Sequence, residues 1–430
     1  MERIIFHVDV NSAFLSWEAV YRLTKLNETV DLRTIPSAIG GDEKKRHGVI
    51  LAKSTPAKAF HVKTGEPIVD AKKKCPGLLL IPPRFEIYHE FSQSLMKLLS
   101  EYTPDVEQYS IDEAFMDMTG TKKLWGDPLT AAHTIKDRIE RELGFTVNIG
   151  ISVNKLLAKM ASDFKKPNLV HTLFPDEIKE KMWPLPVSDL FFVGKSSAST
   201  LNALGITTIG ELARTDLAVL QHHLKSHGEV IWHYANGREH VILDHSEANK
   251  GYGNSTTVPF DICNEDEAHL VLLSLAETVG MRLRKDHVKI STISVTIKTF
   301  DLKSCSHQRI LSNPTDITNE IYHTACGLFS ELWDYQTPIR LLGIQTSRID
   351  TSEIRQISLE DCFSELNPPA PNHEKLTKAD HMADTIRNRF GMDSVKRASF
   401  ISDTKVEAMS GGLSKAKLKK GTKNPNSKRR

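Results

Sequence analysis

The chain has 430 residues, 40% hydrophobic and 26% charged, which is enough for roughly two to four globular domains. No apolar run reaches the ~18–20 residues of a membrane span, and no signal peptide is evident, so an integral membrane protein and a secreted protein are both disfavoured. The formal charge of +2 is uneven: residues 414–430 hold eight Lys or Arg and no acid, which leaves −6 for residues 1–413. A body of this charge can bind nucleic acid only if its basic residues gather on one face.

The first 173 residues mix strand and helix patterns without a regular βαβ order, which predicts the α+β class. A buried strand ends at Asp9, and Ser12 is the expected N-cap of a helix that runs to about residue 26. Apolar spacing and turn residues predict the elements that follow. These are strands near 34–39, 48–52 and 146–151, a hairpin over 106–118, and helices over 85–101, 128–142 and 154–164.

Three carboxylates are expected at neighbouring strand ends. Asp9 ends the first strand, and a turn at Asp112 and Glu113 would bring both of these to one edge of the hairpin. Such a group is a hard-oxygen site for Mg²⁺, which keeps positions for phosphate oxygens. Two ions about 3.5–4 Å apart can stabilise the attacking and leaving oxygens of a phosphoryl transfer. The alternative is that all three are solvated surface residues, turn formers or caps.

Residues 174–240 are helical in pattern, and 191–206 within them are typical of a helix-hairpin-helix. Gly194 would form the turn, and a left-handed Gly205 would end the second helix. Backbone N–H groups beside Gly194 and Lys195 would then bind DNA phosphates without reading sequence. Because Phe192 stands where the first glycine of the motif is expected, a plain helical hairpin remains the alternative.

Residues 252–349 have the split βαβ order, with helices near 265–285 and 315–333. The strand 290–300 alternates, so that one face is apolar and would pack on the helices. Its other face, which carries Ser294, Thr296 and Lys298, is polar and mildly basic and suits phosphate contacts. An ordinary solvated sheet face is the alternative.

Regular structure is expected to stop at the Pro-rich linker 367–371, to return as a weak helical pattern over 374–400, and to end in a disordered basic tail over the last seventeen residues. The five cysteines are scattered, odd in number and never spaced as Cys-x-x-Cys. This usage fits a reducing cytoplasm and disfavours a thiolate zinc site or a disulfide framework.

Four motifs occur in a characteristic order: Asp9-Val-Asn-Ser-Ala-Phe14, Ser110-Ile-Asp-Glu113, Gly150-Ile-Ser-Val-Asn-Lys155 and Lys166-Pro-Asn168. Together they resemble the bacterial Y-family translesion DNA polymerases, over residues 1 to about 350. The resemblance implies a right-hand architecture and low-fidelity, Mg²⁺-dependent nucleotidyl transfer by a cytoplasmic monomer. It implies a palm at 1–12 and 84–173, fingers at 13–83, a thumb at 174–240, a DNA-binding little finger at 250–350 and a C-terminal tail at 351–430.

The resemblance also implies roles for individual residues at the metal site. Asp9 and Asp112 match the carboxylates that bridge two Mg²⁺ ions. Glu113 matches the third carboxylate, near the primer 3′-hydroxyl, and Val10 matches a position whose backbone carbonyl completes the site. Phe14 matches the steric gate, an aromatic ring under the sugar that leaves no room for a 2′-hydroxyl. Without the resemblance, a core aromatic beside Trp17 is the preferred interpretation of Phe14.

The triphosphate would lie near Ser12, Ala13 and Phe14. The family usually has a Tyr and an Arg three residues apart in the fingers, where this chain has Thr55 and Lys58. A hydroxyl and an ammonium can bind phosphate, although Lys lacks the bidentate fork of Arg. Lys166 matches a palm lysine that reaches the triphosphate, and a solvated surface lysine is the alternative for both lysines.

Further along, Gln356-Ile-Ser-Leu359 resembles the start of a sliding-clamp-binding peptide, whose Gln and aliphatic side chains fill pockets on the partner. The expected aromatic residue is replaced by Glu360, so the end of the last little-finger strand is the alternative.

The sequence offers two alternative functions. A DNA- and clamp-binding accessory protein could keep the fold without turnover, but the intact carboxylates Asp9, Asp112 and Glu113 favour an enzyme. Gly40-Gly-Asp-Glu43 resembles the diguanylate cyclase signature. It is followed by Lys44-Lys-Arg-His rather than by an apolar strand, which disfavours a cyclase.

Overall fold

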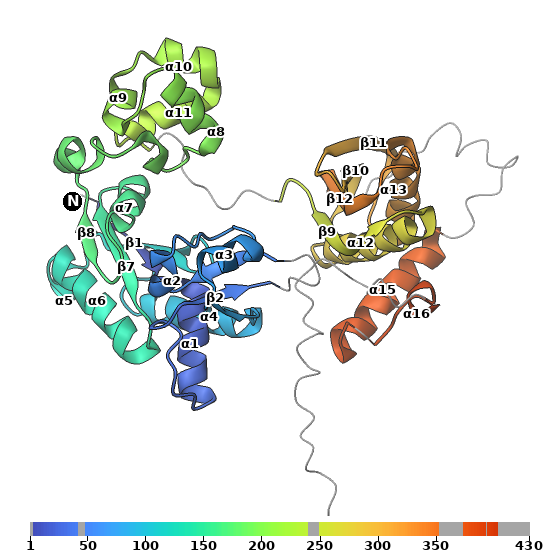
Figure 1. Ribbon diagram of the computed structural model, residues 1–430, viewed down its shortest axis with the longest axis horizontal. Helices are drawn as coiled ribbons and strands as arrows, with labels where there is room; N and C mark the ends of the chain where they lie inside the picture. Colours follow the sequence, from blue (N-terminus) through green and yellow to red (C-terminus); the bar gives the residue numbers. More distant parts are fainter. Residues whose placement is uncertain (1–2, 42–47, 240–248, 352–372, 393, 403–430) are drawn as a thin grey trace, which may run out of the picture. The chain divides into compact units, whose positions relative to one another are not determined.

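The computed structural model describes residues 3–41, 48–239, 249–351, 373–392 and 394–402 (Figure 1). The chain divides into two compact units, one comprising residues 1–42 and 48–245 and the other mainly residues 246–430. Both combine helices with largely antiparallel sheets, which confirms the α+β class. The residues expected to bind a sliding clamp, Gln356 and Leu359, lie outside the described residues, as do the linker 367–371 and the basic tail.

The first unit is built on a five-stranded sheet with the order β5-β6-β1-β7-β8, in which β1 lies antiparallel between β6 and β7. Every residue of β1 and β7 is buried, the polar residues His7, Asp9, Asn148 and Ser152 included, because helices cover this part of the sheet. The strands are β1 (Ile5–Val10), β5 (Val106–Gln108), β6 (Glu113–Asp117), β7 (Val147–Ser152) and β8 (Val170–Thr172).

Helices α4, α6 and α7 pack on this sheet or on one another, and α1 packs on α4. The approach of α7 is unusually close: a Cβ on Gly150 of β7 would lie 1.9 Å from the carbonyl oxygen of Ala158, so only glycine fits there. The helices are α1 (Ala13–Lys25), α4 (Phe85–Leu99), α5 (Lys122–Trp125), α6 (Pro128–Leu143) and α7 (Lys155–Ser162).

Ser12 is the N-cap of α1, as predicted, but its backbone is left-handed, with φ at 50°, and its side chain makes no capping hydrogen bond. Its carbonyl instead accepts from the N–H of Ser16, whose hydroxyl donates to the carbonyl of Asn11 at 2.6 Å. The tight turn therefore fixes Asn11 and Ser12 at the end of β1.

A separate three-stranded sheet, ordered β3-β2-β4, follows α1. The strand β4, which runs parallel to β2, was not predicted, because it is only three residues long. The elements are β2 (Ser37–Gly40), β3 (Ile50–Lys53), α2 (Thr55–Ala59), α3 (Ile68–Lys74) and β4 (Leu79–Ile81).

Residues 174–239, called here the helical segment, are mainly helical, as predicted, apart from an isolated bridge between Pro186 and Thr208, and have their own buried core. The predicted end of the hairpin helix α8 is confirmed. Gly205 has φ at +79°, and the N–H of Ile206 donates to the carbonyl of Leu201 at 2.9 Å. The elements are the short turns Pro175–Glu177, Ile178–Met182 and Val187–Asp189, and α8 (Lys195–Ala203), α9 (Ile209–Arg214), α10 (Leu217–Leu224) and α11 (Ser226–Ala235).

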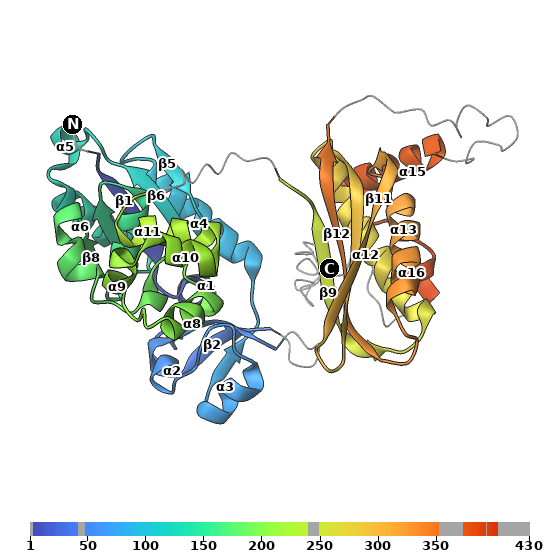
Figure 2. The same cartoon turned by 90° about the horizontal axis from the view of Figure 1, so that it is seen from above.

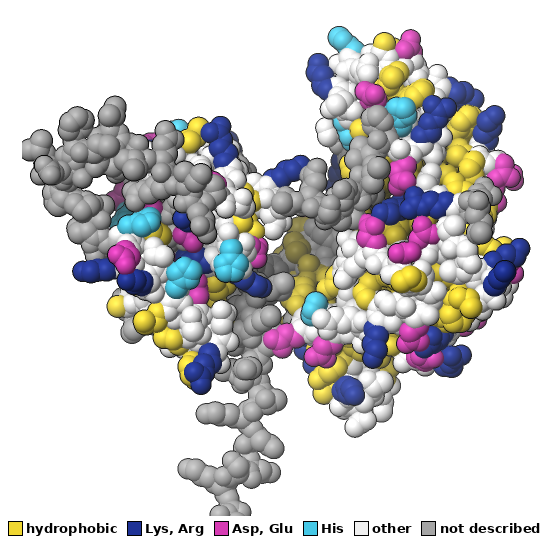
Figure 3. Space-filling model, turned by 180° about the vertical axis from the view of Figure 1, so that it is seen from behind, with side chains coloured by type: hydrophobic (Ala, Val, Ile, Leu, Met, Phe, Trp, Pro, Cys, Tyr) yellow, Lys and Arg dark blue, Asp and Glu magenta, His cyan; other side chains and the backbone are white. Residues whose placement is uncertain are grey.

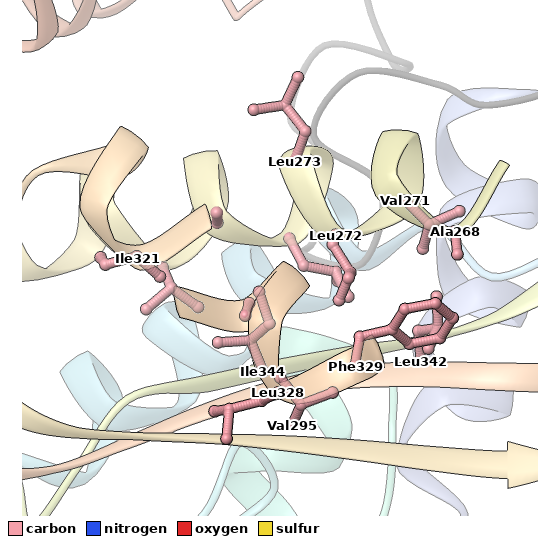
Figure 4. Close-up of a cluster of buried hydrophobic side chains, with 14 of the residues drawn as sticks. Ala268, Val271, Leu272, Leu273, Val295, Ile321, Leu328, Phe329, Leu342 and Ile344 are labelled. Atoms are coloured by element: carbon pink, nitrogen blue, oxygen red, sulfur yellow. The ribbon is translucent and has the colours of Figure 1, made fainter. Parts of the chain in front are cut away.

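The second unit has the predicted order of strand, helix, two strands, helix and strand, and its sheet is ordered β11-β10-β12-β9 (Figure 2). Its core lies between this sheet and two helices, where Leu272 points towards the strands while Leu273 points away from them (Figure 4). The elements are β9 (Gly253–Ile262), α12 (Glu265–Lys285), β10 (Lys289–Thr299), β11 (Ser304–Thr315), α13 (Thr318–Leu332) and β12 (Ile339–Asp350).

The weak helical pattern near the C-terminus is confirmed as α15 (His373–Phe390), with a short α16 (Ser399–Ser402) after it. Buried ion pairs attach α15 to α12. Glu277, 3% exposed, accepts from Arg387 at 3.3 Å and from Arg397 at 2.7 Å. Two turns further along α12, Arg284 donates to Asp384 of α15 at 2.6 Å. The helix α15 therefore forms an additional layer on the second unit.

Replacing Glu277 with Ala is expected to destabilise this layer by about 3–5 kcal/mol, because the buried guanidinium of Arg387 would lose its counter-ion. Amide hydrogen exchange over residues 373–390 is the measurement, and protection there should fall more than in α13. The control is Glu374→Ala, which breaks an exposed pair with Lys378 and should cost under about 1 kcal/mol. Unchanged protection in the Glu277 variant would show that apolar contacts alone hold α15.

Within the described residues, no helix is both long enough and apolar enough to cross a membrane. On the face seen in Figure 3, Lys and Arg side chains are interspersed with Asp and Glu. Net charge alone therefore does not identify a binding surface on this face.

Candidate active site

The site is centred on two carboxylates that face each other across neighbouring strands. Asp9, near the end of β1, lies directly opposite Glu113, the first residue of β6. Opposed residues on antiparallel strands share a face, with Cβ atoms about 4.5–5.5 Å apart. Asp9 is 7% exposed, so its carboxyl group lies at the margin of the core.

Asp112 joins them through the turn that precedes β6. Its backbone carbonyl accepts from the N–H of Val10 at 3.0 Å, which fixes the turn to the end of β1. The hydroxyl of Ser110 donates to its Oδ1 at 2.7 Å and orients the carboxylate. Asp9, Asp112 and Glu113 thus lie at the neighbouring ends of β1 and β6, with the turn lying just before Glu113.

Two lysines pair with these carboxylates. Lys166 bonds to Asp9 and lies 2.9 Å from Asp163, and Lys159 of α7 bonds to Glu113. Burial raises the pKa of Asp9 to about 6, against the opposing effect of Lys166, and nearby Glu113 raises it further. The pKa of Lys166 is also raised, because its two acidic partners outweigh its burial. The site thus holds negative charge that needs cations close by.

The donor atoms fit Mg²⁺, which prefers carboxylate and carbonyl oxygens. Among the described residues, however, no three side chains of His, Cys, Asp or Glu already surround a single point where an ion could bind. The ammonium groups of Lys159 and Lys166 lie against two of the carboxylates instead. Oδ2 of Asp9 and Oε1 of Glu113 are therefore each bonded to a lysine.

The loop that carries Lys166 is anchored by amide side chains. The N–H of Asn168 donates to Oδ1 of Asn11 at 2.9 Å, and Asn11 donates to Asn148 at 3.2 Å. Asn148, fully buried on β7 opposite Asp9, also donates to the carbonyl of Lys165 at 2.7 Å. Asn11 and Asn148 were missed in the sequence, although an amide within the apolar strand β7 was a usable signal.

Phe14 lies in the first turn of α1 and is partly buried. Its ring stacks on that of Tyr88, with centroids 5.0 Å apart and planes at 16°, and meets the edge of Phe85 at 5.8 Å. The hydroxyl of Tyr88 donates to the buried Glu18, which also binds Arg84. Phe14 thus contacts the core, including Trp17 at 6.1 Å between ring centroids, while part of its side chain remains accessible.

The other residues predicted to contact the nucleotide lie at the start of α1 and on α2. Ser12 is exposed and Ala13 is buried at the start of α1. Thr55 and Lys58 are both exposed on α2, whose N-cap Ser54 accepts from the N–H of Ala57. They are one helical turn apart on α2, which packs against β2 of the three-stranded sheet.

The hairpin of the helical segment contains the predicted phosphate-binding residues. Gly194 is the N-cap of α8 and Lys195 is its first residue. They line a hollow of about 420 Å³ with Ser188, Ser199 and neighbouring residues. Phe192, in place of the expected glycine, adopts a left-handed backbone with φ at 74°, so the turn keeps its shape with a non-glycine residue.

In the second unit, Ser294, Thr296 and Lys298 alternate along β10 with the buried Ile293, Val295 and Ile297. Their neighbours across β11 are Gln308, Ser306 and Ser304. The predicted polar face is therefore present, on the side of the sheet that α12 and α13 leave uncovered (Figures 1 and 2).

Family models match three parts of the chain. The impB/mucB/samB family matches residues 8–163, its C-terminal domain matches residues 249–359, and the HHH motif of the IMS family matches residues 175–206. The third match contains the hairpin with Gly194. The first contains all three carboxylates.

Curated relatives are similar over nearly their whole length. DNA polymerase IV of Clostridium acetobutylicum is 47% identical over 93% of this chain and 98% of its own. DNA polymerase IV 2 of Bacillus subtilis is 35% identical over 93% of this chain and 95% of its own. A solved chimeric Y-family DNA polymerase shares the fold, with a TM-score of 0.69 at 23% identity over 81% of this chain and 100% of that chain. The chain therefore belongs to the impB/mucB/samB family, the Y family of DNA polymerases.

Proposed function

We propose that the chain is a DNA-dependent DNA polymerase that carries out Mg²⁺-dependent nucleotidyl transfer in low-fidelity translesion synthesis. The observation that carries the proposal is the cross-strand pair of Asp9 and Glu113 with Asp112 in the adjoining turn. The family supplies the substrates: primer–template DNA and deoxynucleoside triphosphates. The primer 3′-hydroxyl attacks the α-phosphorus, and pyrophosphate leaves.

Asp9, Asp112, Glu113 and the carbonyl of Val10 would hold two Mg²⁺ ions. When bound, these ions supply Lewis-acid stabilisation of charge on the reacting oxygens. Lys166, released from Asp9, binds the triphosphate, while Thr55 and Lys58 contact it from α2. Phe14, supported from behind by Tyr88, excludes a 2′-hydroxyl. The hairpin at Gly194 and Lys195 and the polar face of β10 bind DNA phosphates without reading sequence.

The test is primer extension by the full chain with increasing Mg²⁺. We expect extension that depends on the ion, stops on chelation and resumes when Mg²⁺ is restored. Tight DNA binding without extension at any Mg²⁺ concentration would favour the alternative, a DNA- and clamp-binding accessory protein of the same fold.

Replacing Gln356 and Leu359 together with Ala should remove the processivity that a loaded sliding clamp confers and leave clamp-free extension unchanged. A tether raises the effective concentration of enzyme at the primer without altering the chemistry. Processivity is measured with and without clamp, and Ser352→Ala is the control. Equal stimulation of the double variant and the wild type would refute a docking role for this peptide.

Deleting residues 414–430 should weaken DNA binding mainly at low ionic strength, since eight cations add a non-specific, salt-screened contribution. The slope of log affinity against log salt should become shallower, whereas the extension rate at saturating DNA should not change. An unchanged slope would leave the tail without a role in DNA binding.

A further inference from the structure

A second lysine at the site, Lys159, has surroundings that the proposed chemistry does not explain. We propose that Lys159 is a positioning residue. It holds Glu113 in place by linking it to the rings of Tyr109 and of Phe191, the second of which belongs to the helical segment. The inference rests on the proposed function, because it assigns to Lys159 a role in the same reaction.

The ammonium of Lys159 is held from several sides. It bonds to Oε1 of Glu113 and lies 5.3 Å from the ring centroid of Tyr109 and 5.4 Å from that of Phe191. Its side chain is only 10% exposed. A cation enclosed by two aromatic rings and a carboxylate has little freedom to move, so it fixes the orientation of the carboxylate it binds.

One of the two rings beside Lys159, that of Phe191, belongs to the helical segment. Phe191 stacks on Tyr234 of α11, with planes at 13°, and its backbone N–H lies 3.3 Å from the sulfur of Met160. Phe191 also directly precedes Phe192, whose left-handed backbone begins the phosphate-binding hairpin. The position of Lys159 therefore depends on how the helical segment packs on α7.

The buried His7 also lies beside Glu113 and limits its movement. Nε2 of His7 lies 3.8 Å from Oε1 of Glu113, and the hydroxyl of Ser162 holds the other ring nitrogen at 2.7 Å. His7 and Lys159 thus both lie next to Oε1 of Glu113. The other carboxylate oxygen of Glu113, Oε2, is the one available to a ligand. Loss of Lys159 would free Glu113 to rotate.

The chain contains a matched control on the same helix. Lys155, one turn before Lys159 on α7, bonds to Glu107 and lies 5.8 Å from the ring of Phe115. Its side chain is 15% exposed. Lys155 shares the residue type, the carboxylate partner and the aromatic neighbour, but Glu107 is not one of the three site carboxylates. Differences between Lys155 and Lys159 variants therefore report on Glu113.

The experiment compares Lys159→Met with Lys155→Met in the full chain. Single-nucleotide incorporation at saturating primer–template and Mg²⁺ gives kcat, and calorimetry with Mg²⁺ alone, without DNA, gives metal affinity. We expect kcat to fall about 10–100-fold for Lys159→Met, with Mg²⁺ bound as tightly as in the wild type or more tightly, because a like charge is removed. Lys155→Met should stay within about twofold of the wild type in kcat.

Phe191→Leu, which keeps both Lys159 and Glu113, should lower kcat about 3–10-fold. This variant tests the inference if Lys159→Met does not fold. The inference is overturned by wild-type kcat in both Lys159→Met and Phe191→Leu, by equal losses in the Lys155 and Lys159 variants, or by Mg²⁺ affinity that falls in parallel with kcat. The proposed function fails separately, if the wild type itself does not extend primers.

Discussion

Asp112→Ala should lower nucleotide incorporation by at least about 10³-fold while leaving DNA affinity nearly unchanged. Metal-borne stabilisation of the transition state is worth several kcal/mol, and about 4 kcal/mol corresponds to three orders of magnitude in rate. DNA affinity depends mainly on phosphate contacts elsewhere. The negative charge of a carboxylate repels DNA phosphates, so its removal should not weaken DNA binding. Incorporation kinetics and fluorescence anisotropy with labelled primer–template measure the two effects.

The matched control is Asp105→Ala, which removes an exposed carboxylate from the loop before β5. It should leave the incorporation rate unchanged. Ser110→Ala should have an intermediate effect, because it removes the hydrogen bond that orients Asp112 but not the carboxylate. Turnover of Asp112→Ala above the level of contaminating enzyme would rule out the assignment of Asp112 to the metal site.

Phe14→Ala should reduce discrimination against ribonucleotides by about 10–200-fold, the range by which one extra group in a pocket is rejected. The gate acts by exclusion, so removing the ring removes the clash with the 2′-hydroxyl and leaves the reacting groups in place. The measurement is the ratio of kcat/KM for a deoxynucleotide and the matching ribonucleotide. Ordinary deoxynucleotide incorporation should fall only modestly.

Phe14→Tyr keeps the bulk of the ring and is the control, for which the selectivity ratio should stay close to that of the wild type. The stack on Tyr88 also makes a purely structural role testable. If Phe14→Ala lowers stability while the ribo/deoxy ratio stays constant, Phe14 is a core residue and the gate lies elsewhere.

Much of the fold could be predicted from the sequence, because local patterns determine it. The strand β10 alternates apolar and polar residues, and the helix pattern of α4 recurs every three or four residues. Three-residue strands such as β4 and β8 have no such pattern, and they form only because a neighbouring strand offers backbone hydrogen bonds. The position of the N-cap at Ser12 could be predicted, whereas its left-handed backbone could not, since the chain leaving β1 imposes this turn.

The carboxylates of the site could also be found in the sequence, since they belong to short motifs at strand ends. Their supporting residues could not. Lys159 meets Glu113 across 46 residues of chain, and Asn148 meets Asn11 across 137. Glu277 and Arg387, 110 residues apart, lie on helices whose charged residues are typical of a solvated face. A buried ion pair cannot be recognised until both of its partners are placed.

Bypass of an abasic site tests the central claim most directly. The full chain is given Mg²⁺, all four deoxynucleotides and a primed template with one abasic residue, next to the same template undamaged. We predict products that extend beyond the lesion, in an amount comparable to those on the undamaged template. Normal extension of the undamaged template with a complete stop at the abasic site would contradict translesion synthesis as the function of this polymerase.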